Sequence, residues 1–319
     1  MKKNVLLMVS LVLAGCASLI PLKVGPPRDI KVEITDERIA RGEYLATAVT
    51  ACIHCHSKLD WDDYGGGFPE PGTEGAGGWH IVESMGIMGG FDLYASNITP
   101  SALGDWTDGE LIRAIVEGVN KKGEPLFPIM PYGRYVNMDE EDLYSIVAYV
   151  RSLKPVANPL PQKKVKRLFK YVERTFPQPY DPKLRPDPSD RVPYGNYLAT
   201  IGDCISCHTP TTGSGKPLEG MHLAGGSSFP LPGGGVVYSS NLTPDPETGI
   251  GEWSEDDFID LFNSFQEPVK VPEYKKGENT VMPWPAYSGM TEEDLGAIFE
   301  YLQSVKPVKH KVEKWPARE

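Results

Sequence analysis

Apolar residues recur with helical spacing in two pairs of segments that lie far apart in the chain. The first pair of stripes comprises Leu111, Ile112, Ile115, Val116 and Val119 in one segment, and Phe258, Ile259, Leu261, Phe262 and Phe265 in the other. The second pair comprises Leu143, Ile146, Val147 and Val150, and Leu295, Ile298, Phe299 and Leu302. Spacings of three and four predict helices that bury one face. These stripes are interpreted as core.

Polar residues in front of these stripes indicate where the helices begin. Thr107-x-x-Glu110 and Ser254-x-x-Asp257 have the form of a capping box. Asp139 and Thr291 are the expected N-caps of the later helices, and the methionine before each, Met138 or Met290, is expected to pack against its helix. Gly- and Pro-rich segments before Asn97 and Asn241 predict loops.

Four matching stretches show that these features belong to an internal repeat. "GEYLATAVTACIHCH" from Gly42 matches "GNYLATIGDCISCH" from Gly195, and "LYASNITP" matches "VYSSNLTP". "GDWTDGELI" matches "GEWSEDDFI", and the "MP" segment before each "EEDL" helix matches its counterpart. Two copies predict a tandem pair of all-α domains, 36–156 and 189–310. A Pro-rich basic linker, 157–188, joins them, and 311–319 form a tail.

The N-terminus has the pattern of an export signal. Lys2 and Lys3 precede an apolar run, Val5 to Ala14, that is too short to span a bilayer. Leu13-Ala14-Gly15-Cys16 resembles a bacterial lipobox. We therefore expect a lipoprotein signal peptide at 1–15, a lipidated Cys16 and a tether at 16–35. The expected location is the bacterial cell envelope, facing the periplasm and anchored to a membrane.

Composition narrows the choice of partners. The chain has 40% apolar and 24% charged residues, which is typical of a globular protein. Its formal charge of −11 and isoelectric point near 5.1 argue against a nucleic-acid partner.

With Cys16 assigned to lipid, the remaining cysteines form two Cys-x-x-Cys pairs, Cys52 with Cys55 and Cys204 with Cys207. Disulfides within such pairs close tiny loops and constrain little. A redox dithiol does not require the histidine that follows each pair. A four-cysteine zinc site would have to join pairs separated by 152 residues and leave both histidines idle.

Covalent attachment of haem c explains the whole pattern. Two thiols three residues apart reach the two vinyl groups of one porphyrin, and the next residue, His56 or His208, supplies the proximal nitrogen to iron. The sequence therefore predicts two covalently attached haem c groups. His54, inside the first motif, is expected to face solvent.

The repeat also suggests the sixth ligands. Met130 and Met282 each lie 74 residues after their own motif histidine and precede a proline. A thioether is a soft axial ligand, and a Met/His pair raises the reduction potential. His80 and His222 are the competing candidates. The repeated Asn97 and Asn241 are compatible with hydrogen bonding to haem propionates or with plain loop structure.

At these residues the sequence resembles the cytochrome c subunits of bacterial membrane-bound gluconate and alcohol dehydrogenases. The Gly-x-Tyr-Leu-Ala run, "SNITP", "SNLTPDPETGIGEW" and the "MP" segments carry the resemblance, which covers most of 36–156 and 189–310. It implies a cytochrome c fold around each haem and electron transfer to a quinone or another cytochrome. Members of that family usually have three haem motifs, whereas this sequence has two.

Two classes of function follow from these expectations. The first is a lipid-anchored electron carrier whose partners are a dehydrogenase, a quinone-linked complex or another cytochrome. The alternative is a dihaem redox enzyme of the peroxidase or thiosulfate dehydrogenase kind. An enzyme needs an iron with an open or displaceable position, and two matched His/Met sites favour the carrier.

Overall fold

The computed structural model describes residues 21–81, 91–167, 169–213, 215–231, 234–272 and 277–316. The expected signal peptide and Cys16 lie outside these residues. The helices of the first half are α2 (Asp36–Tyr44), α3 (Cys52–Cys55), α5 (Pro100–Leu103), α6 (Asp108–Ile112), α7 (Tyr132–Tyr135) and α8 (Glu140–Ser152). Then come α9 (Phe169–Val172), α10 (Arg191–Ile201), α11 (Cys204–His208), α12 (Glu255–Asn263), α13 (Trp284–Tyr287) and α14 (Glu292–Ser304).

Short turns of other helix types extend this framework. Turns of π-helix, η2 (Leu45–Val49) and η4 (Arg113–Glu117), continue α2 and α6, and the 3₁₀ turns are η3 (Tyr64–Gly66) and η5 (Glu173–Thr175). The described chain is thus rich in helix, as the apolar stripes predicted.

A small antiparallel ribbon is the main departure from the predicted loops. β1 (Ser228–Pro230) pairs with β2 (Val236–Tyr238), with Phe229 opposite Val237. It lies in the Gly- and Pro-rich segment before Asn241. Because the described residues contain only this short ribbon beside many helices, the fold agrees with an all-α protein of the cytochrome c type.

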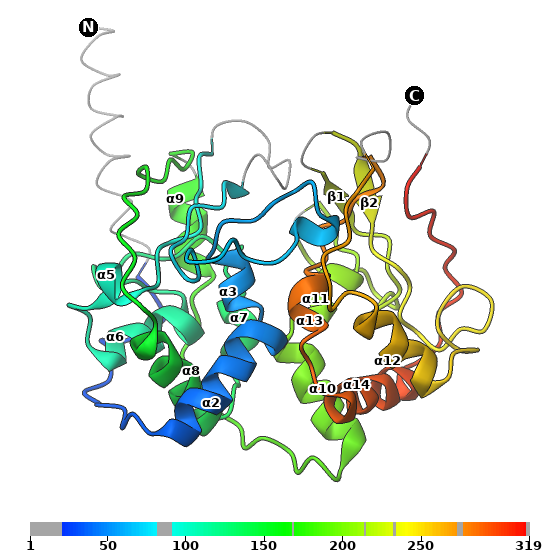
Figure 1. Ribbon diagram of the computed structural model, residues 1–319, viewed down its shortest axis with the longest axis horizontal. Helices are drawn as coiled ribbons and strands as arrows, with labels where there is room; N and C mark the ends of the chain where they lie inside the picture. Colours follow the sequence, from blue (N-terminus) through cyan, green and yellow to red (C-terminus); the bar gives the residue numbers. More distant parts are fainter. Residues whose placement is uncertain are drawn as a thin grey trace, which may run out of the picture.

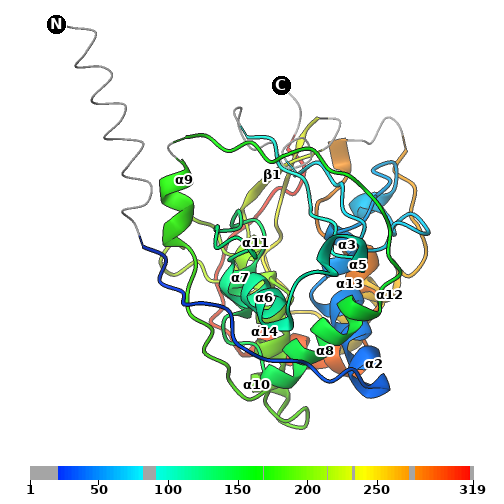
Figure 2. The same cartoon turned by 90° about the vertical axis from the view of Figure 1, so that its left-hand side faces the viewer.

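Two helix pairs organise the two halves. α2 packs against α8 in the first half, and α10 packs against α14 in the second (Figures 1 and 2). Gly42 and Gly195 make both crossings possible. A Cβ atom at Gly42 would overlap the Ser145 carbonyl, and one at Gly195 would overlap the Ala297 carbonyl. The glycine of each Gly-x-Tyr-Leu-Ala run therefore lets two backbones meet.

The predicted helix starts are confirmed. Thr107 and Ser254 each form a complete capping box, at α6 and α12. Asp139 caps α8 and Thr291 caps α14 through their side chains. Each cap satisfies backbone N–H groups that have no partner within the helix.

Both halves contribute to one continuous hydrophobic cluster. It contains Leu45 and Leu143 from the first half and Leu198 and Leu302 from the second, all nearly inaccessible to solvent. Met138 and Met290 are also buried in it, in agreement with their predicted packing role. The two halves therefore share one hydrophobic core.

Reciprocal polar contacts join the halves at the edge of this core. The Tyr44 hydroxyl donates to Asp294 Oδ2 at 2.6 Å, and the Tyr197 hydroxyl donates to Asp142 Oδ2 at 2.7 Å. Tyr44 and Tyr197 are equivalent in the repeat, as are Asp142 and Asp294. Each half thus presents the same tyrosine to the same aspartate of the other.

Asn97 and Asn241 fasten loops to the chain that follows the last helix of each half. The Asn97 amide donates to the Val156 carbonyl at 2.7 Å, and the Asn241 amide donates to the Val308 carbonyl at 2.8 Å. The Oδ1 of Asn97 accepts the Thr99 N–H at 2.9 Å, and the Oδ1 of Asn241 accepts the Thr243 N–H at the same distance. These bonds favour the loop interpretation over propionate binding.

The linker lies along the first half. Its Tyr180 hydroxyl donates to the Met138 carbonyl at 2.9 Å, and Arg185 forms an ion pair with Asp142. Its basic stretch contains α9, and Phe169 of this helix packs edge-on against Phe91 of the first half, with ring centroids 5.3 Å apart. The linker is therefore docked on the first half through these contacts.

Among the described residues, no helix combines the length and the apolar character that crossing a bilayer requires.

Candidate haem-binding sites

The two Cys-x-x-Cys-His motifs have the same local structure. Cys52 and Cys55 lie on α3, with His56 at its C-terminal end, and Cys204, Cys207 and His208 lie on α11. The residue before each helix is left-handed, with φ of 50° at Ala51 and 58° at Asp203. This conformation is costly for a residue with a side chain and often marks a functional constraint.

Each motif histidine is held in one orientation by the backbone. His56 Nδ1 lies 2.6 Å from the Ser96 carbonyl, and His208 Nδ1 lies 2.7 Å from the Ser240 carbonyl. Because a carbonyl oxygen only accepts, Nδ1 must carry the proton and donate. The Nε2 atom then keeps its lone pair, which is the form that binds a metal.

Burial keeps both imidazoles neutral. It lowers the pKa of His56, and it lowers the pKa of His208 to about 4, against the opposing effect of the hydrogen bond to Ser240. A neutral imidazole at pH 7 is required of an iron ligand.

None of the four motif cysteines forms a disulfide. Burial raises the pKa of Cys55 and of Cys204 to about 12, and that of Cys52 and Cys207 also rises. Such thiols stay protonated, which is unsuited to a reactive dithiol or a thiolate site. Among the described residues, no group of three or more His, Cys, Asp or Glu side chains is arranged to hold a metal ion.

Met130 and Met282 lie at the edge of the hydrophobic cluster, partly buried. Each methionine lies just before a short helix, α7 or α13. Its backbone carbonyl accepts a hydrogen bond from the N–H of the residue two positions later. The distances are 2.9 Å from Tyr132 and 2.8 Å from Trp284. The same tight turn therefore presents both methionines.

The competing histidines are engaged elsewhere. His80 stacks on Tyr94, with ring centroids 4.5 Å apart, and its Nε2 lies 3.1 Å from Asp92 Oδ1. His222 Nε2 lies 3.2 Å from the Tyr301 hydroxyl. These contacts favour the methionines as sixth ligands.

His54 does not face solvent, contrary to the sequence-based expectation. Its side chain is buried, and burial lowers its pKa to about 4 against the opposing effect of the nearby Gly65 backbone. The sequence pattern around His54 gave no hint of this because Gly65 belongs to the following loop.

The two motifs lie close to each other. Arg134, on α7 of the first half, donates through Nε to the Ser206 hydroxyl at 2.7 Å and lies 3.4 Å from Asp203 Oδ1. Ser206 is inside the second motif and Asp203 directly precedes it. Arg134, which no sequence pattern indicated, therefore links α7 of the first half to the second motif.

The residues present fit haem c. Each motif supplies two thiols and an imidazole oriented by the backbone, which are the groups that covalent haem attachment requires. Within the described chain the indole Nε1 of Trp284, beside Met282, is buried without a protein partner. A buried donor of this kind suits a group with acceptor oxygens, such as a haem carboxylate.

Comparison with known proteins also supports a cytochrome c. The chain is 30% identical over 287 residues to the cytochrome c subunit of the quinone alcohol dehydrogenase of Gluconacetobacter polyoxogenes, covering 85% of this chain and 56% of that one. It is 29% identical to the gluconate 2-dehydrogenase cytochrome c subunit of Pantoea cypripedii, covering 86% and 60%. The expected resemblance to cytochrome c subunits is confirmed.

The chain spans little more than half the length of these cytochrome c subunits. A diheme cytochrome c-type protein of Cereibacter sphaeroides matches over its full length, at 26% identity and over 97% of this chain. No protein-family model matches the chain.

Proposed function

We propose that this chain is a dihaem cytochrome c that relays electrons between a dehydrogenase or quinone and a downstream respiratory acceptor. The observation that carries the proposal is the pair of identical histidine orientations behind the two motifs. An imidazole fixed through Nδ1 to a backbone carbonyl is the arrangement expected of a structural metal ligand, and it occurs twice.

In the first domain, 36–156, Cys52 and Cys55 attach the haem, and His56 and Met130 bind iron. In the second domain, 189–310, Cys204 and Cys207 attach the haem, and His208 and Met282 bind iron. Bound haem supplies one-electron chemistry, and the protein sets its potential through the axial ligands and burial. The residues themselves orient the ligands and exclude water.

The cellular setting is part of the proposal. A lipidated Cys16 anchors the chain to a membrane of the bacterial envelope, facing the periplasm, and redox proteins approach the folded body. The dehydrogenase subunits among the relatives support a dehydrogenase as electron donor. Coordination of both irons by histidine and methionine leaves neither position open, which supports a carrier over an enzyme.

The haem content is the first test. A pyridine haemochrome assay on the purified protein should give two haem c groups per chain. A variant with Cys204→Ala and Cys207→Ala should give one, and so should a variant with Cys52→Ala and Cys55→Ala. Two haems retained in either variant would show that the motifs do not attach them.

The electron donor is tested by purification from native membranes in mild detergent, with mass spectrometry of all associated chains. A dehydrogenase in fixed ratio supports the proposed relay. If reduced protein binds carbon monoxide rapidly at one iron before any perturbation, that site is open and the enzyme alternative replaces the carrier.

A further inference from the structure

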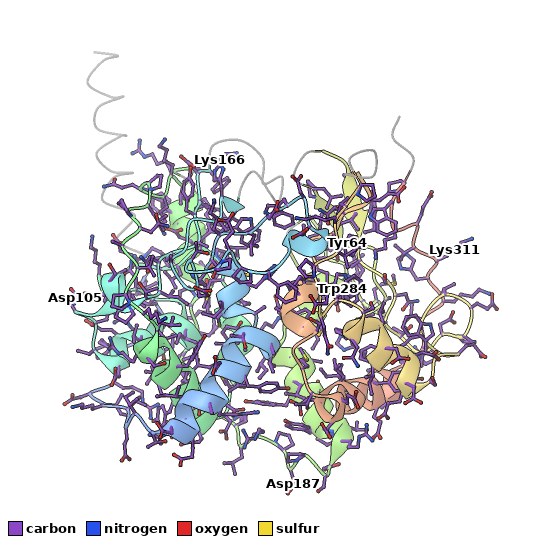
Figure 3. The ribbon with its side chains drawn as sticks, in the orientation of Figure 1. Tyr64, Asp105, Lys166, Asp187, Trp284 and Lys311 are labelled. Atoms are coloured by element: carbon purple, nitrogen blue, oxygen red, sulfur yellow. The ribbon has the colours of Figure 1, made fainter. Side chains whose placement is uncertain are left out.

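A loop of the first half lies on the second half. This crossing loop, residues 59–67, contains η3 (Tyr64–Gly66), which contacts α13 (Trp284–Tyr287). Figure 1 shows the light-blue turn beside α13, and Figure 3 shows Tyr64 directly above Trp284. The loop follows the first haem motif, whereas α13 follows Met282.

Main-chain hydrogen bonds fix the loop to the second half. The Tyr64 N–H donates to the Val269 carbonyl at 2.7 Å, and the Val271 N–H donates to the Asp62 carbonyl at 2.9 Å. These bonds pair two segments that are more than 200 residues apart, so they define the position of the loop independently of its side chains.

Side chains strengthen the same contact. Tyr64 stacks on Phe265 with centroids 5.6 Å apart, and Phe265 stacks on Trp284 at 4.6 Å. Lys270 Nζ lies 2.6 Å from Asp63 Oδ1. An aromatic column thus leads from the crossing loop to α13.

Asn279 of the second half acts as a clasp on the loop. Its Oδ1 accepts the Gly65 N–H at 2.9 Å, and its Nδ2 donates to the Trp61 and Asp63 carbonyls at 3.2 and 3.3 Å. Asn279 is only 3% exposed. Losing these bonds in a buried site leaves several polar groups without partners, which is costly.

The clasp continues directly to Met282. Asn279 Oδ1 also accepts the Thr280 N–H at 2.7 Å, and Thr280 Oγ1 accepts the Met282 N–H at 3.1 Å. Gly65 touches the far side of this segment: a Cβ atom there would lie 2.7 Å from the Met282 carbonyl oxygen. Met282 is therefore held between Gly65 and Thr280.

The first haem motif supports the other side of Gly65. Buried His54 lies beside the Gly65 backbone. A continuous chain of contacts thus leads from the attachment helix of the first site, through Gly65, to the methionine of the second.

The repeat does not reproduce this arrangement. Gly77 follows His56 by 21 residues, whereas the equivalent Gly225 follows His208 by 17, so the loop is longer in the first half. The residue equivalent to Asn279 is Phe127, whose side chain cannot form the clasp bonds. The asymmetry is therefore built into the sequence.

We propose that the crossing loop of the first half completes the second haem site by holding Met282 on the iron, with Gly65 and Asn279 as positioning residues. This inference rests on the proposed function, in which Met282 is an axial ligand. The second site then depends on the first half, whereas Met130 has no equivalent clasp asparagine.

A matched pair of glycine substitutions tests the proposal. Gly65→Ala and Gly66→Ala both introduce a side chain at a left-handed residue, with φ of 70° and 84°. At Gly65 the new Cβ meets the Met282 backbone, whereas at Gly66 it meets Leu59 at 3.2 Å and Trp61 at 3.4 Å, within the loop. Both variants place a side chain in the left-handed region, but only the one at Gly65 contacts Met282.

The readout is the near-infrared charge-transfer band of ferric haem with a methionine ligand, together with imidazole binding. We expect Gly65→Ala to lose about half of the band, since one of two haems is affected, and to bind imidazole at one iron. Gly66→Ala should keep the full band. Asn279→Ala should resemble Gly65→Ala, and it decides the question if Gly65→Ala does not fold.

The outcomes separate this inference from the proposed function. If the unmodified protein lacks the band, His/Met coordination itself is wrong and the inference falls with it. If the unmodified protein has the full band and both Gly65→Ala and Asn279→Ala retain it, only the role of the crossing loop is overturned. A loss of band in Gly66→Ala equal to that in Gly65→Ala would also overturn it.

Discussion

The Tyr44 hydroxyl donates to Asp294 across the boundary between the two halves, over a distance of 2.6 Å. The equivalent bond, Tyr197 to Asp142, has a different setting. Asp142 also pairs with Arg41, whose Nε lies 2.9 Å from Oδ1, and with Arg185. Both aspartates are buried, at 7% and 1% exposure. The two tyrosines therefore make the same bond to differently supported carboxylates.

This difference predicts unequal effects of removing the hydroxyls. Tyr44→Phe should lower the free energy of unfolding by about 2 kcal/mol, since a buried carboxylate loses a charge-assisted hydrogen bond. Tyr197→Phe should cost about 1 kcal/mol, because two arginines still neutralise Asp142. Urea unfolding of both variants measures this. Equal losses would show that the arginines do not compensate.

The glycines at the helix crossings predict a large steric effect. Gly42→Ala and Gly195→Ala place a methyl group on a facing carbonyl, so each should destabilise by about 3 kcal/mol or prevent folding. Gly133→Ala is the control, because a Cβ there meets no atom within 4 Å. Thermal unfolding and haem content should both separate the first two variants from the third.

Asp203 predicts a pH dependence of stability. Burial raises the pKa of this carboxyl to about 6, against the lowering effects of Ser206 and Arg134. The folded state then binds a proton more readily than the unfolded state, whose pKa is 3.8. The contribution of Asp203 to the free energy of unfolding should therefore fall as pH rises from about 4 to 6 and stay constant above that.

Asp203→Asn tests this assignment with little backbone cost, because asparagine tolerates the left-handed conformation. The variant should be the more stable protein at pH 7, by about 3 kcal/mol, and the two should converge near pH 4. Urea unfolding at several pH values gives the difference. A constant difference across this range would contradict the pKa of Asp203.

The choice of sixth ligands predicts that two histidines are dispensable for coordination. His80→Ala and His222→Ala should both keep the full methionine charge-transfer band, because each imidazole is engaged with another side chain. Met130→Ala and Met282→Ala should each remove about half of it. If the unmodified protein shows only half of the band expected for two haems, and a methionine variant removes none of it, the assignment at that methionine's site is wrong.

Features that depend on neighbouring residues could be predicted from the sequence. The capping boxes at Thr107 and Ser254 and the apolar stripes of α8 and α14 have signatures within one or two helical turns, and the structure contains them. The Cys-x-x-Cys-His motifs are equally local. Their short spacing alone suggested that the two cysteines attach haem through thioether bonds, as proposed above.

Features that depend on distant residues could not be predicted. The partner of Tyr44 is 250 residues away, and no local pattern identifies it. His54 was expected to face solvent because its neighbour His56 takes the role of iron ligand, and nothing in the local pattern indicates that the His54 side chain is buried. The ribbon of β1 and β2 was likewise hidden in a Gly- and Pro-rich segment whose composition favours loops.

The reciprocal contacts of Tyr44 and Tyr197 have the geometry of a two-fold homodimer interface, in which one patch binds a copy of itself. Here both patches belong to one chain, and the docked linker makes their meeting intramolecular. Because the linker is covalent, this contact forms within one molecule and does not depend on the protein concentration. The spacing between the two haem motifs is therefore independent of dilution, which a pair of separate single-haem proteins could not guarantee.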